Sequence, residues 1–257
     1  MFERAKLGAA MLTLVCVATA GAGCSSNELQ YQRTTIDGQE VLRAARTDAP
    51  IRGVVIVFHG LDRDETLLEL DDAHTELTAT LADAGFAVVA ASAGGNAYGN
   101  AESQRHYSAL VHDSIDRYDA DTVFFLAESM GTVAAVNIMA DEEDLPVAGL
   151  AAINPLLNLD ALSTRYREAA EEAFAGQPLS TSNPLALPVD SIAGQNLRLY
   201  VTPEDLLVST SENASAFEER FGETANISLV RCSGAHLDPS CIQGEDIVEW
   251  FDSITPE

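Results

Sequence analysis

The sequence around Ser129 limits the folds open to this chain more than any other segment. Residues 123–126 form an apolar run, and residues 132–140 follow with the composition of a helix. Between them lies Ala127-Glu128-Ser129-Met130-Gly131, whose small flanking residues allow a sharp turn between a strand and a helix. Such a turn lifts a serine hydroxyl above the end of a sheet, where it can act as a nucleophile. An ordinary helix N-cap is the alternative for the motif alone.

An acid and a histidine follow later predicted strands. Residues 197–201 end in Thr202-Pro203-Glu204-Asp205, and the apolar residues 227–230 lead into a loop that contains His236. The chain therefore presents a serine, then an acid, then a histidine, each just beyond the carboxyl end of a predicted strand.

A further loop follows the first long apolar run. Residues 53–58 are typical of a buried parallel strand and end in His59-Gly60-Leu61. Backbone N–H groups in such a loop can face the serine if the two strands lie side by side.

These groups in this order resemble the α/β-hydrolase superfamily, in particular its serine esterases and lipases, over roughly residues 50–254. The resemblance implies an α/β fold with a mostly parallel, doubly wound sheet, an opening antiparallel hairpin and a short cap insertion. The family's functional positions match the nucleophile Ser129, the acid Asp205, the base His236, and the oxyanion-hole N–H groups of Leu61 and Met130.

The chemistry explains why these residue types occur together. A neutral serine hydroxyl is a poor nucleophile, so we expect His236 to take its proton during attack and return it to the leaving group. A carboxylate beside the ring holds the tautomer and stabilises the imidazolium. Asp205, with Val208 three places later, matches the family's acid position, while Glu204 and Asp160 are alternative acids.

Two loop segments are expected to shape the pocket. Residues 155–195 lie between predicted strands and are expected to form a small cap over the active site. The alternative is a surface loop that does not contact the substrate. Asn96 and Tyr98 follow the strand predicted at residues 86–91 and are candidate pocket residues. His59 lies at the same edge and is a third candidate pocket residue, which we interpret as a hydrogen-bonding residue and not as the base.

The N-terminus has the features of a signal peptide. Arg4 and Lys6 precede the apolar residues 7–20, a stretch too short for a bilayer span of about 20 apolar residues. Residues 1–23 are therefore predicted to be removed.

Small residues before Cys24 resemble a bacterial lipobox, in which the cysteine is lipidated and becomes the mature N-terminus. This resemblance predicts an exported lipoprotein, anchored in the cell membrane and facing outward, with residues 24–49 as tether and opening hairpin. Cleavage after Ala20 is the alternative, and it gives a secreted protein with a free thiol at Cys24.

The cysteines agree with export. Cys16 lies in the predicted leader and lipidation accounts for Cys24, which leaves Cys232 and Cys241 to form a disulfide around His236. A zinc site is disfavoured, because these residues lack the paired short spacings of zinc ligands. The predicted mechanism needs no metal and no organic cofactor.

Composition limits the remaining possibilities. A chain of 257 residues with 47% hydrophobic content can form one sizeable catalytic domain, at residues 50–257. Residues 31–35 and 40–45 are predicted to form the opening hairpin. A formal net charge of −26 disfavours binding to nucleic acid, because such a surface repels phosphate groups.

The sequence thus predicts a serine hydrolase that cleaves a small-molecule or lipid-like carboxylic ester through an acyl-enzyme on Ser129. A peptidase or an acyltransferase with the same triad is an alternative, and so is a non-catalytic binding protein of the same fold. The presence of a serine, an acid and a histidine together favours an enzyme.

Overall fold

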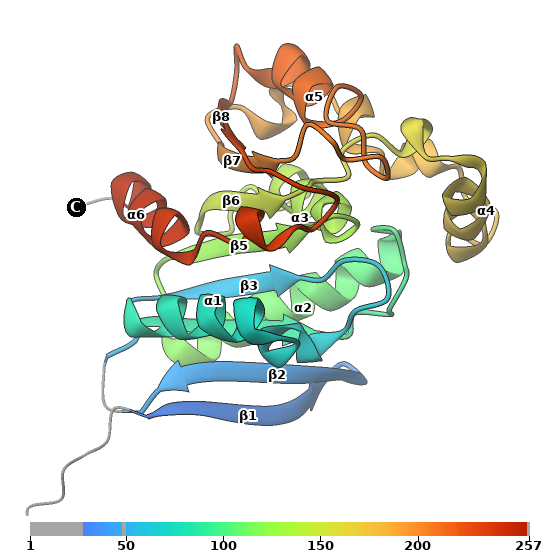
Figure 1. Cartoon of the computed structure of the whole chain (residues 1–257). Helices are drawn as coiled ribbons and strands as arrows, with labels where there is room; N and C mark the ends of the chain where they lie inside the picture. The colour runs from blue at the N-terminus through green and yellow to red at the C-terminus, as the bar shows by residue number, and fades with distance from the viewer. Residues whose placement is uncertain (1–27, 48–49, 256–257) are drawn as a thin grey trace, which may run out of the picture.

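One eight-stranded sheet forms the centre of the protein, with the strand order β1-β2-β4-β3-β5-β6-β7-β8 (Figure 1). The structure is a computed structural model, and it describes residues 28–47 and 50–255. The predicted signal peptide at residues 1–23 and the predicted lipidation site Cys24 lie outside the described residues. The strands are β1 (Leu29–Ile36), β2 (Gln39–Arg46), β3 (Gly53–Phe58), β4 (Phe86–Ala91), β5 (Val123–Glu128), β6 (Val147–Ile153), β7 (Asn196–Val201) and β8 (Asn226–Arg231).

The sheet begins antiparallel and continues parallel. β1 and β2 form the predicted antiparallel hairpin, and β2 pairs antiparallel with β4. Asp37 and Gly38 make the hairpin turn with φ angles of 48° and 78°, the positive values that two-residue hairpin loops require. From β4 to β8 every neighbouring pair is parallel, so these strands all end at one edge of the sheet.

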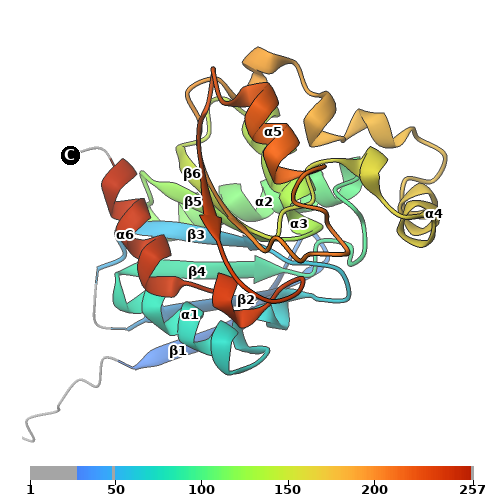
Figure 2. The same ribbon diagram turned by 45° about the horizontal axis from the view of Figure 1, so that its top comes forward.

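Helices cover both faces of the sheet, as Figure 1 and Figure 2 show together. α1 and α6 cover one face, where Leu77, Leu81 and Phe251 join the core. α2, α3 and α5 cover the other, where Leu110 and Phe217 join the core. No helix within residues 28–47 and 50–255 is long and apolar enough to cross a membrane. The helices are α1 (Asp72–Asp83), α2 (Ala101–Tyr118), α3 (Gly131–Asp141), α4 (Thr164–Ala173), α5 (Ala214–Phe221) and α6 (Gly244–Ile254).

The segment between β6 and β7 leaves the sheet at its carboxyl edge. It contains α4, which Figure 1 shows beyond the ends of the central strands, and several short 3₁₀ helices. Ala170 and Phe174 of this segment pack with Tyr98 and Met130 in a small apolar cluster. The segment is therefore fixed beside the loops that follow β4 and β5. Its 3₁₀ helices are η2 (Leu159–Ala161), η3 (Leu179–Thr181), η4 (Pro184–Ala186) and η5 (Val189–Ile192).

Candidate active site

The site lies where β3 and β5 end side by side. These strands are in register, with Phe58 paired to Ala127, and every residue of both strands is buried. The chain leaves β3 toward α1 on one face and leaves β5 toward α3 on the other. A crevice opens at such a switch point in a parallel sheet, because the two connections diverge there.

The turn at Ser129 has the geometry that the sequence predicts. Ser129 has a φ of 46°, a left-handed backbone conformation that residues other than glycine rarely adopt. A Cβ atom at Gly131 would lie 2.3 Å from the carbonyl oxygen of Phe58, so only glycine fits there. The Ser129 N–H donates to the Ile153 carbonyl at 2.9 Å, and the Ser129 carbonyl accepts from the Leu156 N–H at 3.0 Å. The serine is thus held above the end of β5.

A continuous hydrogen-bond chain joins the candidate nucleophile, base and acid. Nε2 of His236 lies 2.9 Å from Oγ of Ser129, and Nδ1 of His236 lies 2.6 Å from Oδ2 of Asp205. A carboxylate can only accept, so the proton of the neutral ring lies on Nδ1. Nε2 is then free to accept the serine proton, which is the arrangement that a general base needs.

The carboxylate of Asp205 is held by several donors. Its Oδ1 accepts from the N–H groups of Leu207 at 2.9 Å and Val208 at 2.8 Å, and its side chain is 1% exposed. Burial alone raises the pKa of Asp205, but the hydrogen bonds from His236 and from the Val208 N–H outweigh it and leave the pKa lowered. Asp205 therefore stays ionised beside the ring.

The alternative acids lie elsewhere. Glu204 is exposed and accepts no side-chain hydrogen bond from the described residues. Asp160 lies in η2 and accepts from the side-chain amide of Asn183 at 3.2 Å. The structure thus pairs His236 with Asp205 and with neither alternative.

Two backbone N–H groups without a partner in the described part of the chain belong to residues that line the same cavity as Ser129. The N–H groups of Leu61 and Met130 donate no hydrogen bond to the described residues, and both residues line the cavity at Ser129. Met130 also caps the start of α3, where the helix dipole favours a negative charge. Asn96 fixes the loop after β3 that contains Leu61, because two hydrogen bonds of 2.7 Å join the side chain of Asn96 to Asp62.

A cavity of about 200 Å³ opens beside the Ser129 hydroxyl, and we call it the serine cavity. Its walls come from the loops after β3, β4, β5, β7 and β8 and from the segment between β6 and β7. Tyr98 lines this cavity, whereas Asn96 lines a neighbouring cavity. The apolar walls include Leu61, Met130, Leu156, Leu162, Leu207 and Val208.

His59 lines neither of these cavities. It is 1% exposed, and its ring nitrogens lie 2.8 Å from the carbonyl oxygen of Gly60 and 2.9 Å from that of Ser92. Its backbone N–H donates to the hydroxyl of Tyr107 at 3.1 Å. The residue ties the β3 loop to the β4 loop, in line with its interpretation as a hydrogen-bonding residue.

Comparison with known proteins gives similarity in structure only. No protein-family profile matches the sequence, and no curated protein is similar to it in sequence. A putative esterase from Staphylococcus aureus has a TM-score of 0.70 over 90% of this chain and 85% of its own, at 13% identity. An S-formylglutathione hydrolase from Agrobacterium tumefaciens has 0.68 over 89% and 95%, at 15% identity. The Pyrococcus furiosus esterase Pf2001 has 0.65 over 89% and 94%, at 17% identity.

This chain has the α/β-hydrolase fold. The predicted fold class is thereby confirmed, because an antiparallel hairpin opens the sheet and most of its other strands are parallel. At these identities the likeness establishes the fold alone, so the roles of the site residues rest on the geometry above.

Asn154 contacts two of these site residues and was not predicted. It follows β6 directly, has a φ of 43° and is 2% exposed. Its side-chain amide donates to Oγ1 of Thr202 at 3.0 Å and to Asp205, and its side-chain oxygen accepts from the Leu237 N–H at 3.0 Å. Its position directly after the apolar residues 150–153 was an available signal.

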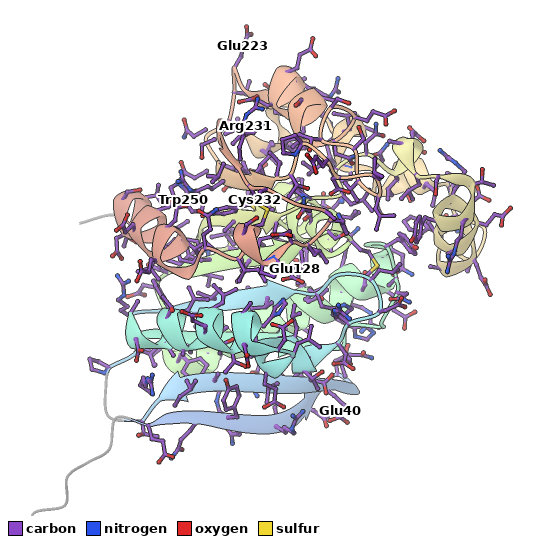
Figure 3. The ribbon with its side chains drawn as sticks, in the orientation of Figure 1. Glu40, Glu128, Glu223, Arg231, Cys232 and Trp250 are labelled. Atoms are coloured by element: carbon purple, nitrogen blue, oxygen red, sulfur yellow. A yellow bond between two sulfur atoms is a disulfide. The ribbon has the colours of Figure 1, made fainter. Side chains whose placement is uncertain are left out.

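A buried carboxylate lies directly before Ser129 and was also not predicted. Glu128, labelled in Figure 3, is 3% exposed, and its Oε1 lies 2.9 Å from Nε2 of His74. Nδ1 of His74 lies 2.7 Å from Oδ1 of Asp71. Burial lowers the pKa of His74, but the hydrogen bond and charge of Glu128, followed by those of Asp71, outweigh burial and leave the pKa raised. The two carboxylates that contact the ring thus favour its protonated form.

The predicted disulfide between Cys232 and Cys241 is present, with Cα atoms 5.3 Å apart. Cys232, labelled in Figure 3, directly follows β8, and the bridge closes the loop that carries His236. Among the described residues, no group of three or more His, Cys, Asp or Glu side chains could hold a metal ion.

Proposed function

We propose that this protein is a serine hydrolase that cleaves carboxylic esters through an acyl-enzyme on Ser129. The observation that carries the proposal is the hydrogen-bond chain from Ser129 through His236 to Asp205, which meets an apolar cavity. The likeness in fold to proteins named as esterases supports the same class of reaction.

The proposed reaction has two halves. Oγ of Ser129 attacks the ester carbonyl while its proton passes to Nε2 of His236, and Asp205 stabilises the imidazolium. The N–H groups of Leu61 and Met130 stabilise the oxyanion of the tetrahedral intermediate. The C–O bond to the alcohol breaks as His236 returns the proton to the leaving oxygen. A water molecule then repeats the sequence on the acyl-enzyme and releases the acid.

The serine cavity supports an acyl group of modest size. Its volume of about 200 Å³ is small beside the roughly 300–1,000 Å³ of pockets that enclose drug-sized ligands. Leucine and valine side chains dominate its walls, and a short acyl chain gains free energy by leaving water there. We therefore propose esters with acyl chains of a few carbons as the preferred substrates.

A fluorophosphonate probe followed by intact-mass analysis tests the nucleophile. Wild-type protein should gain one adduct, Ser129→Ala should gain none, and Ser114→Ala should label like wild type. Ser114 is the matched control because it is a fully buried serine in α2 that lines neither cavity described here.

Substrate assays then test the reaction class. Release of nitrophenol from p-nitrophenyl esters should be fastest for short acyl chains and absent in Ser129→Ala. Labelling of Ser129 with faster cleavage of peptide anilides than of esters would replace the esterase by the peptidase alternative. Acyl transfer to an added alcohol in place of hydrolysis would favour the acyltransferase. A folded protein that takes no label and cleaves no ester contradicts the proposal.

A further inference from the structure

A second cavity of about 380 Å³ adjoins the serine cavity, and we call it the polar cavity. The two cavities share a wall, which consists of Leu61, Asp62, Tyr98 and Tyr166. The polar cavity is further lined by Asn96 and by Arg165 and Glu172 of α4. Ser129 lines the serine cavity and not the polar cavity. A ligand that occupies both cavities therefore has one end at Ser129 and the other end among polar side chains.

The hydroxyl of Tyr98 in this shared wall is buried and has no hydrogen-bond partner among the described residues. Tyr98 is 2% exposed and has a φ of 49°, an uncommon conformation that often marks a functional position. Burial raises its pKa, and electrostatic interactions with Tyr166 and then Asp62 raise it further. Tyr98, Tyr166 and Asp62 each line both cavities, so Tyr98 lies at their junction. A buried polar group without a partner points to a ligand that supplies one.

The charges around the polar cavity disfavour an ionic ligand. A bound anion meets the carboxylates of Asp62 and Glu172, and a bound cation meets the guanidinium of Arg165. A neutral ligand with several hydroxyl groups suits all three, because each hydroxyl both donates to a carboxylate and accepts from a guanidinium. The aromatic rings of Tyr98 and Tyr166 add apolar surface for the carbon atoms of such a ligand.

We infer that the polar cavity binds the alcohol portion of the ester, and that this alcohol is uncharged and carries several hydroxyl groups, as glycerol and sugars do. The inference rests on the proposed ester hydrolysis. The acyl chain lies in the serine cavity, and the leaving oxygen lies near the shared wall, where it takes its proton from His236. Tyr98 hydrogen-bonds the alcohol and thereby selects it.

Esters that share one butyryl group and differ in the alcohol test this assignment. Wild-type protein should cleave the glycerol monoester with a kcat/KM about tenfold or more above that for ethyl butyrate, because a site that hydrogen-bonds a hydroxyl discriminates against substrates without it. Equal values for the two esters, or a preference for the choline ester, would overturn the assignment.

Tyr98→Phe removes the hydroxyl and keeps the ring. It should lower the ratio of kcat/KM for the glycerol ester to that for ethyl butyrate about tenfold, the effect of one lost hydrogen bond. Tyr31→Phe is the matched control, because the Tyr31 hydroxyl is also buried without a partner but lies on β1, away from both cavities. This control should leave the ratio unchanged.

Wild-type activity on p-nitrophenyl butyrate distinguishes failure of the alcohol-subsite assignment from failure of the esterase proposal. If that ester is cleaved but Tyr98→Phe keeps the wild-type ratio, the alcohol subsite is wrong and the esterase proposal stands. If wild-type protein cleaves no butyrate ester, both proposals fail. Arg165→Gln changes an exposed side chain of α4 and is a second test of the subsite. It should also lower the ratio of kcat/KM for the glycerol ester to that for ethyl butyrate.

Discussion

The side-chain amide of Asn154 donates a hydrogen bond of 3.1 Å to Oδ2 of Asp205, the same oxygen that lies 2.6 Å from Nδ1 of His236. The side-chain oxygen of Asn154 accepts from the N–H of Leu237, the residue after this histidine. One buried amide therefore links the acid loop after β7 to the histidine loop after β8. Asn154 sets the distance between the two loops without touching the serine.

Replacing Asn154 with alanine should lower kcat on p-nitrophenyl butyrate about 10- to 100-fold with little change in KM, because a small misplacement of the base raises the barrier to reaction. Asn213→Ala is the matched control, since Asn213 is equally buried at 2% exposure and accepts from the N–H groups of Leu157 and Asn158. The control should lose comparable stability and keep kcat. Equal kcat values for the two variants would contradict a positioning role.

The acid can be identified by neutralising each candidate in turn. Asp205→Asn should lower kcat/KM by about three to four orders of magnitude, because an amide no longer holds the proton on Nδ1 of His236. Glu204→Gln and Asp160→Asn should stay within about twofold of wild type, since neither carboxylate contacts the ring. Initial rates on one ester suffice for this comparison. A large loss of activity in Asp160→Asn alone would assign the acid role to Asp160, which lies in η2 after β6.

The sequence predicted the central strands because their physical signal is local. β3 at residues 53–58 and β4 at residues 86–91 coincide with the predicted runs, since strands buried on both faces are apolar throughout. α2 also has a local signal in the sequence, because Asn100 supplies its N-cap. Ser129 was recognisable for the same reason, because the strand, the turn and the helix are contiguous.

The parts that could not be predicted depend on contacts between distant residues. Three acids follow predicted strands, and only the meeting of the β7 and β8 loops selects Asp205. Glu128 meets His74 from a different element, and no local pattern reports that contact. The segment at residues 155–195 forms one helix and several 3₁₀ helices, because its prolines interrupt longer ones. Its predicted role as a cap stays a prediction.

The Cys232–Cys241 disulfide should stabilise the protein and restrain the histidine loop. Replacing both cysteines with serine should lower the free energy of unfolding by about 2 to 3 kcal/mol, the expected effect of closing a short loop. Turnover should fall as well, because His236 lies inside that loop. Urea unfolding with and without a reducing agent measures the change, and the agent should affect wild type but not the double variant. An unchanged unfolding midpoint would show that packing alone holds the loop.

The raised pKa of His74, which lies between Glu128 and Asp71, should make stability depend on pH. The folded protein binds a proton at this histidine more tightly than the unfolded chain, because the pKa of His74 is raised in the fold. The stabilisation is therefore complete below the unfolded pKa of about 6.5 and is lost as pH rises through the higher folded pKa.

In that window the free energy of unfolding of wild type should fall by at most about 1.4 kcal/mol per pH unit, the limit for one proton. Urea unfolding at a series of pH values should show this decline in wild type and not in His74→Gln, which keeps a hydrogen-bonding group that does not titrate. Glu128→Gln should flatten the profile in part, because it removes one of the two negative charges beside the ring. It should have no further effect on the slope when added to His74→Gln. Parallel profiles for wild type and His74→Gln would mean that His74 carries no extra proton in the folded state.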